Sequence, residues 1–242
     1  MKIDNTTVAV VTGAASGIGR ALAVRLAAEG AQLAICDVNE TELKETARLA
    51  TKPGVKISTH VVDVSDRGRM QGFVSEVIAE HGRAHLIINN AGVALGGTVE
   101  ELAIEDFEWL LGINLWGVLY GTKMFLPILR QQAQGHIVNI SSVLGLLGLP
   151  FRSGYAIAKH AINGFTRSLA VEVARAGITV NAVAPGYILT ETLQARLDAG
   201  LLDYARYAER APAGRWGLAE EVAHLIAFLA LPASGTPCRV TG

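Results

Sequence analysis

The sequence predicts an α/β fold in which helices cover both faces of a doubly wound parallel sheet, a three-layer αβα arrangement. Short runs rich in Val, Ile and Ala alternate along the chain with longer segments of helical spacing. The short runs are almost continuously apolar, which is typical of parallel strands buried on both faces. Half of the 242 residues are hydrophobic, so one domain over residues 1–242 can bury a large core.

Six strands are evident. They are residues 8–13, 32–37, 57–64, 85–92, 136–142 and 178–185. The clearest helical segments are residues 18–30, 68–82 and 155–177. Each of these helices ends at a glycine, because Gly30, Gly82 and Gly177 can supply the left-handed turn that stops a helix.

Residues 190–215 break this alternation, since they carry many charges, show no strand signal and follow a strand directly. We expect a helical substrate lid there. The alternative is a long surface connection. No repeat, low-complexity stretch or linker divides the chain, which favours a single domain.

The composition excludes several classes of protein. Charged residues make up 18% of the chain and the formal net charge is −1, so no basic field attracts nucleic acid. Cys36 and Cys238 form no CxxC pair, which fits a reducing compartment. There is no signal-peptide pattern, and no run approaches the roughly 20 apolar residues of a membrane span. The histidines show no metal-ligand spacing. We expect a soluble cytoplasmic protein without a metal, nucleic-acid or membrane partner.

A glycine-rich turn follows the first strand. It reads TGAASGIGR over residues 12–20, with Gly13, Gly17 and Gly19 spaced GxxxGxG. A strand that turns directly into a helix leaves backbone N–H groups unpaired, and with the helix dipole they form a pocket for a pyrophosphate. Glycines permit the tight turn and let a phosphate approach the backbone. The spacing differs from the commoner GxGxxG fingerprint, so the inference needs the flanking strand and helix and an acid downstream.

That acid is Asp37, 18 residues past Gly19 at the end of the second strand. A carboxylate there can accept both adenosine ribose hydroxyls and would repel a 2′-phosphate by about a few kcal/mol. The neighbouring Ser16 and Val38 are not basic, so the sequence predicts NAD rather than NADP. The alternative role for Asp37 is a helix N-cap, for which Asn39 is equally suited.

Asp63 and Val64 close the third strand, in VVDVSD. Because the carboxyl ends of the strands line the binding crevice of such a sheet, Asp63 could accept a hydrogen bond from an adenine amino group. It could equally cap the following helix, where Ser65 or Asp66 would also serve.

A tyrosine and a lysine stand four residues apart in YAIAK, so Tyr155 and Lys159 share one face of a helix. A phenol of ordinary pKa is on the order of a thousandth ionised at pH 7. An ammonium about 5 Å away stabilises the phenolate by roughly 3 kcal/mol at an effective dielectric of about 20. Burial opposes this, and we expect the charges to win and to lower the pKa of Tyr155. The pair therefore indicates general acid–base chemistry.

Seven motifs resemble, in order and spacing, those of the classical short-chain dehydrogenases/reductases, over nearly the whole chain. They are TGAASGIG (12–19), DV (63–64), NNAG (89–92), Asn114 in INLWG, SSVLG (141–145), YAIAK (155–159) and PGYILT (185–190). The resemblance implies a Rossmann-type domain that moves hydride between a nicotinamide and an alcohol or ketone carbon, as a homotetramer or homodimer. The cofactor-binding positions that it implies are Gly13, Ser16, Gly17, Ile18, Gly19, Asp37, Asp63, Val64, Asn90, Ala91, Gly92, Tyr155, Lys159, Pro185, Gly186, Ile188 and Thr190.

The same resemblance completes the catalytic set with Ser142 and Asn114. It assigns Ser142 to the substrate oxygen, where a neutral hydroxyl polarises a carbonyl or steadies an alkoxide. Ser141 points to the other face of an extended strand, so only one of the two serines can face a cleft. Asn114 is implied to hold a water that relays protons toward Lys159, and the alternative is a packing amide. Thr190, with its backbone neighbours, is implied to hold the nicotinamide carboxamide.

The substrate is less well defined by the sequence. An apolar wall of Leu144, Leu149, Tyr187 and Leu193 suits a hydrophobic secondary alcohol or ketone. One alternative is a 3-oxoacyl-thioester (acyl carrier protein) reductase that uses NADPH, for which Arg152 and Arg196 are the available cations. An alternative of another class is a nucleotide-sensing protein without turnover.

The chain departs from the family at its end. Family members usually continue into a seventh strand, whereas this sequence stops at CRVTG. We expect that strand to be missing, which leaves residues 178–185 as an apolar sheet edge unless a neighbouring chain covers it.

Overall fold

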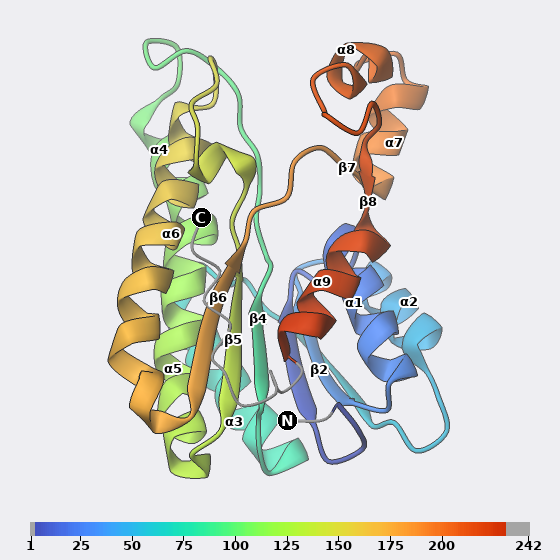
Figure 1. Ribbon diagram of the computed structural model, residues 1–242, viewed down its shortest axis with the longest axis vertical. Coiled ribbons are helices and arrows are strands. Elements are labelled where there is room, and N and C mark those ends of the chain that lie inside the picture. Colours follow the sequence, from blue (N-terminus) through green and yellow to red (C-terminus); the bar gives the residue numbers. More distant parts are fainter. Residues whose placement is uncertain (1–2, 231–242) are drawn as a thin grey trace.

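The computed structural model describes residues 3–230, and its centre is a six-stranded sheet in which every pairing is parallel (Figure 1). The strand order is β3-β2-β1-β4-β5-β6. The strands are β1 (Val8–Thr12), β2 (Gln32–Asp37), β3 (Ile57–Val61), β4 (Leu86–Asn89), β5 (Gly135–Ile140) and β6 (Ile178–Val183). The Rossmann-type α/β fold expected from the sequence is therefore confirmed.

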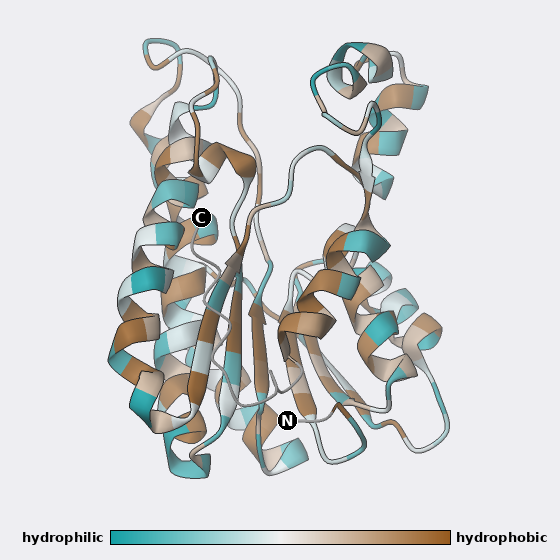
Figure 2. Ribbon diagram, in the orientation of Figure 1, coloured by the Kyte–Doolittle hydropathy of each residue, from teal (hydrophilic) through white to brown (hydrophobic). Residues whose placement is uncertain are grey.

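Helices form a layer on each face of this sheet. One layer holds α1 (Gly17–Ala28), α2 (Glu40–Ala50) and α9 (Ala219–Ala230), and the other holds α3 (Arg67–His81), α5 (Gly117–Gln132) and α6 (Ser153–Val173). Val11 packs into the first core and Val10 into the second, so successive residues of one strand are both buried. Figure 2 shows the result, strands that are apolar along most of their length.

The predicted strands overrun their observed ends at the carboxyl edge of the sheet. The expected strand 57–64 ends at Val61, and the expected strand 85–92 ends at Asn89. Beyond Asn89 the backbone leaves the ladder, because the N–H groups of Asn90 and Ala91 donate to the Thr12 hydroxyl instead. The residues beyond the observed strand ends therefore form the loops at the carboxyl edge of the sheet.

Two helix ends show why a glycine was needed. Gly82 caps α3 with φ of 72°, and Gly177 has φ of 70° after a short turn, η3 (Ala174–Ala176). Residues other than glycine rarely adopt this left-handed backbone conformation. Both positions agree with the stops read from the sequence.

A short α4 (Ile104–Leu111) runs through a π-helical turn, η1 (Gly112–Trp116), into α5, and η2 (Val143–Gly145) follows β5. Residues 187–218, called the helical segment below, follow β6. They contain β7 (Ile188–Leu189), α7 (Glu191–Asp198), α8 (Tyr204–Ala208) and β8 (Gly217–Leu218). In Figure 1 the helical segment stands at the same end of the sheet as the loops that precede α4 and α6.

Two further expectations concern the remaining parts of the chain. The expectation of a missing seventh strand and the residue Cys238 concern residues 231–242, which lie outside the described residues. Within residues 3–230, no helix combines the length and apolarity that crossing a membrane requires.

Candidate active site

The glycine-rich turn is built without room for side chains. A Cβ on Gly13 would lie 2.6 Å from the Ala91 Cα, and a Cβ on Gly19 would collide with the Gly13 carbonyl oxygen. The Asn90 amide fixes the turn from the neighbouring strand, since its Nδ2 donates to the carbonyls of Thr12 and Gly13 at 2.9 Å each. The predicted tight turn is therefore present and is held rigidly.

The N-terminus of α1 already attracts an anionic group. Ser16 is its N-cap residue and makes no side-chain capping bond. The Gly17 N–H donates to Oε2 of Glu191 at 2.7 Å. That carboxylate oxygen stands where the sequence predicts a phosphate oxygen, so the turn fits the pyrophosphate of a dinucleotide. Ile18 is partly buried in the first turn of the helix.

Asp37 lies beside this turn. Its Oδ2 accepts from the Ala15 N–H and its Oδ1 from the Asn39 N–H, both at 3.0 Å. Asn39 caps α2, so the alternative reading of Asp37 as that helix cap is wrong. The adjacent Val38 is exposed and apolar. Neither Ser16 nor Val38, the two positions considered in the sequence, supplies a cation beside Asp37.

Arg20 is a cation near the turn that sequence reasoning missed. Its guanidinium pairs with Glu42 and with Glu191, and it also donates to the Ala15 carbonyl. Its position in the motif TGAASGIGR was the available signal, because residues one turn along a helix lie near its N-terminus.

Asp63 does not cap the helix that follows it. Its Oδ1 accepts from the N–H and hydroxyl of Ser65 at 2.9 and 2.6 Å, while Asp66 caps α3. The capping alternative for Asp63 is therefore wrong, and the adenine contact stays a prediction. Val64 is buried against Gly117, where a Cβ would lie 2.7 Å from its Cγ2.

The tyrosine, lysine and one serine meet at the start of α6. Lys159 is 3% exposed, its Nζ donates to the Ile140 carbonyl at 2.7 Å, and it lies 5.4 Å from the centre of the Tyr155 ring. Ser142 hydrogen-bonds the Tyr155 side chain. Ser141 instead donates to the Lys159 carbonyl at 3.2 Å, so Ser142 is the serine beside the phenol.

The electrostatics of this cluster differ from the expectation. Burial raises the pKa of Tyr155, and the Ser142 hydrogen bond and the Arg152 charge oppose that rise only in part. Burial also lowers the pKa of Lys159 to about 8. The expected net lowering of the Tyr155 pKa is wrong for these residues, because burial of the phenol outweighs the groups that favour its anion.

Asn114 lies in the π-helical turn and is fully buried. Its side-chain amide donates to the Val93 carbonyl and accepts from the Val93 N–H, both at 2.8 Å. A Cβ on Gly92 would lie 3.2 Å from Oδ1 of Asn114 and 3.7 Å from Nζ of Lys159. Gly92, Asn114 and Lys159 are thus neighbours. The Asn114 amide packs against the Val93 backbone, and its role in a proton relay stays a prediction.

The motif PGYILT joins β6 to the helical segment. The Pro185 carbonyl accepts from the Val143 N–H at 2.9 Å, which ties this exit to the loop that carries Ser142. Gly186 is exposed and Ile188 lies in β7. Thr190 caps α7, and a Cβ on Gly17 would lie 3.0 Å from its methyl group. The motif therefore reaches from the tyrosine site to the glycine turn.

The predicted substrate residues belong to two separate loops. Leu144 and Leu149 flank the loop after β5, while Tyr187 and Leu193 belong to the helical segment, and all four are partly buried. The Tyr187 ring packs on Tyr207 and on Trp216, at 4.8 and 5.8 Å between ring centres.

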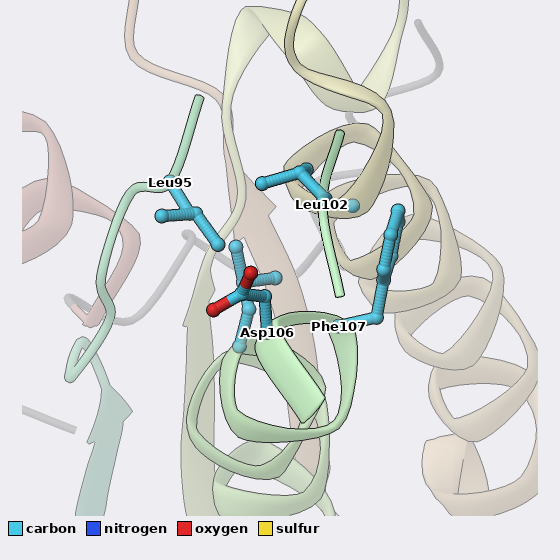
Figure 3. Close-up of a pocket in the computed structure, with 6 residues that line it drawn as sticks. Leu95, Leu102, Asp106 and Phe107 are labelled. Carbon is cyan, nitrogen blue, oxygen red and sulfur yellow. The ribbon is translucent and has the colours of Figure 1, made fainter. Parts of the chain in front are cut away.

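A shallow depression beside the tyrosine site, with no room for even a water molecule, was not anticipated. It is lined by Leu95, Leu102, Asp106, Phe107, Leu110 and Gly154. Figure 3 shows Leu95 and Phe107 on opposite sides of it with Leu102 between them. Gly154 precedes Tyr155 in the chain, so this apolar wall adjoins the tyrosine. Its residues come from three segments, which is why no single motif revealed it.

Several known proteins resemble this chain over most of its length. A family model described as short chain dehydrogenase matches residues 7–199. Levodione reductase of Leifsonia aquatica is 40% identical over 230 residues, covering 92% of this chain and 86% of that protein. The 3-oxoacyl-(acyl-carrier-protein) reductase FabG of Thermotoga maritima is 37% identical, with 92% and 89% covered. Cyclohexanol dehydrogenase of an Acinetobacter strain is 35% identical, with 93% and 88% covered.

Solved structures agree in fold. The crystal structure of levodione reductase has a TM-score of 0.88 at 38% identity and covers 93% of this chain and 91% of its own. ElxO with NADP bound has a TM-score of 0.89 at 32% identity, with 94% and 92% covered. An NAD⁺-bound xylitol dehydrogenase has a TM-score of 0.87 at 30% identity, with 96% and 94% covered.

Proposed function

This chain belongs to the classical short-chain dehydrogenase/reductase family, and from that premise we propose that it is an NAD(H)-dependent oxidoreductase of a hydrophobic secondary alcohol and its ketone. Family membership supports a nicotinamide cofactor and an alcohol or ketone substrate. The observation that carries the proposal is the Tyr155, Ser142 and Lys159 cluster, which lies at the same sheet edge as the glycine turn.

In this proposal Tyr155 is the general acid and base. When a ketone is reduced, the phenol gives its proton to the carbonyl oxygen as the carbon gains hydride, and alcohol oxidation is the reverse. Ser142 donates a hydrogen bond to the same oxygen and so stabilises developing negative charge. The bound nicotinamide supplies or accepts the hydride.

Lys159 would stand beside the tyrosine and bind the cofactor. With a pKa of about 8 its ammonium is mostly protonated at pH 7, and it can donate hydrogen bonds to the nicotinamide ribose. The buried Ile140 carbonyl holds the ammonium in place. Asn114, next to Gly92 and Lys159, is the group that would pass protons onward to solvent through a water.

The glycine turn and the PGYILT motif would hold the dinucleotide, with Gly17 and Gly19 at the phosphates, Thr190 at the nicotinamide carboxamide, and Asp37 and Asp63 at the adenosine. Asp37 supports NAD, because its carboxylate would repel a 2′-phosphate and Val38 offers no cation. The neighbouring structures hold both NADP and NAD⁺, so the choice is tested by measuring the dissociation constants of NADH and NADPH. Tighter NADPH binding would overturn the role of Asp37.

The apolar side chains around the tyrosine support a hydrophobic, cyclic or long-chain substrate. Leu144 and Leu149 follow Ser142 in the loop after β5, Tyr187 follows β6, and mostly apolar side chains line the depression next to Gly154. The helical segment, residues 190–215 above all, would act as the lid over it. The likeness to FabG makes 3-oxoacyl-thioester reduction the second candidate.

One experiment separates these functions. Secondary alcohols, cyclic ketones and a 3-oxoacyl thioester are screened with NADH and with NADPH, following absorbance at 340 nm. We expect turnover of apolar ketones with NADH. Turnover of the thioester with NADPH would favour the second candidate, and binding of either cofactor with no turnover would favour a nucleotide sensor. The cytoplasmic location and the homotetramer or homodimer stay predictions, the latter checked by light scattering.

A further inference from the structure

Glu191 makes a contact that the proposed function does not use. It is the first residue of α7 and lies 174 positions along the chain from its partner. Its carboxylate accepts from the Gly17 N–H at 2.7 Å and from Nη1 of Arg20 at 3.2 Å. Its side chain is 53% exposed, so packing does not force it there. The contact is therefore made by charge and hydrogen bonding.

The same groups that hold Glu191 are those suited to a phosphate. The N-terminus of a helix carries a partial positive charge and free N–H donors, which bind carboxylates and phosphates alike. Arg20 supplies the nearby cation, and Glu42 pairs with it as well. Two carboxylates thus already neutralise the positive charge at the site where the pyrophosphate of a dinucleotide is expected.

We propose that Glu191 competes with the cofactor for the N-terminus of α1, so that this side chain lowers dinucleotide affinity and fastens the helical segment to the glycine turn until the cofactor displaces it. This inference rests on the proposed function, since it assumes that a dinucleotide binds at the turn. Thr190 lies against Gly17 beside it, so displacement of Glu191 moves the start of α7.

The expected change in dinucleotide affinity follows from the fraction of molecules in which Glu191 has left the turn. A ligand that binds only the released state has its apparent affinity reduced by the fraction of molecules in that state. Couplings of this kind change affinities about 5- to 150-fold. For a partly exposed carboxylate we expect the low end, about 5- to 20-fold.

The test is equilibrium binding to Glu191→Gln, which keeps the size of the side chain and removes its charge. The dissociation constant of NADH is measured by its fluorescence, and those of ADP and adenosine by competition with NADH. We expect Glu191→Gln and Glu191→Ala to bind NADH and ADP about 5- to 20-fold more tightly than the wild type. Adenosine carries no phosphate, and its affinity should stay within about twofold.

The matched control is Glu209→Gln. Glu209 ends α8 in the same helical segment and is exposed, so it removes the same charge without touching the turn. Its NADH affinity should equal that of the wild type. Unchanged or weaker NADH binding by both Glu191 variants, or equal tightening of adenosine, would overturn the inference while leaving the proposed function intact. Failure of the wild type to bind NADH, NADPH or ADP would overturn both.

Discussion

The carboxyl edge of the sheet and the helical segment are held together by different means. At the sheet edge, buried side chains bond to one another across strands: Asn89 donates to Asn139 at 2.8 Å and to Thr122 at 3.0 Å, and Asn139 donates to Thr166 at 2.9 Å. In the helical segment only Ala208 and Trp216 are buried. Its contacts include packed aromatic rings, the ion pair of Arg215 with Glu221 and the carboxylate of Glu191.

This difference separates two tasks. Hydrogen bonds between buried side chains favour one geometry, since breaking them leaves a buried polar group unpaired at a cost. A segment with few buried residues opens more readily than a core. In our proposal the chemistry therefore lies on the rigid edge, at Tyr155, Ser142 and Lys159, and the adjustable part would cover the cofactor and substrate. Three substitutions test this division, from the largest expected effect to the smallest.

Tyr155→Phe removes the proton donor and leaves the rigid edge unchanged. We expect turnover to fall about a hundredfold to ten-thousandfold, because general acid–base catalysis contributes on that order. The NADH dissociation constant should stay within about twofold. Tyr120→Phe is the control, as Tyr120 of α5 packs on Trp116 of η1. A Tyr155→Phe enzyme with wild-type turnover would remove Tyr155 from the chemistry.

Gly19→Ala tests the rigid edge itself. The new methyl group would meet the Gly13 carbonyl and lie 2.7 Å from Nδ2 of Asn90, so the turn must shift. Overpacking of this kind costs about 1–3 kcal/mol, and we expect a lower Tm and at least tenfold weaker NADH binding. Gly164→Ala in α6, where nothing lies within 4 Å, should leave NADH binding unchanged. Equal behaviour of the two variants would contradict the assigned role of the turn.

Arg152→Gln has the smallest expected effect. Arg152 lies against Gly96, and its charge lowers the pKa of Tyr155. Because alcohol oxidation requires the phenolate, loss of that charge raises the pKa of Tyr155 and moves the alkaline rise of the oxidation rate to higher pH. At pH 7 oxidation should slow several-fold, and ketone reduction should change less. The pH–rate profile checks this against Arg167→Gln, an exposed arginine farther along α6. An unmoved profile would exclude Arg152 from tuning the tyrosine.

Sequence reasoning succeeded where structure is local. The period of the apolar residues predicted the strands, and the turn at Gly13–Gly19 followed from a strand meeting a helix. Asn39 was one of two candidates for the cap of α2, and it could be named because a cap bonds a backbone group three residues away. Residues close together in the chain determine each of these features.

It failed where distant segments meet. The sign of the Tyr155 pKa shift depends on the depth of burial and on the Ile140 carbonyl that holds Lys159. Glu191 reaches Gly17 across 174 positions, and no local pattern announces such a contact. The π-helical turn that places Asn114 against Val93 was likewise not predicted, since its sequence reads as an ordinary apolar helix.

The most direct test of the account is a crystal structure of this protein with NAD⁺ bound. We predict that the pyrophosphate lies at the N-terminus of α1, with Glu191 displaced, and that the nicotinamide ring lies beside Tyr155 with Ser142 and Lys159 around it. A nicotinamide ring far from Tyr155, or a Lys159 ammonium turned to solvent, would contradict it.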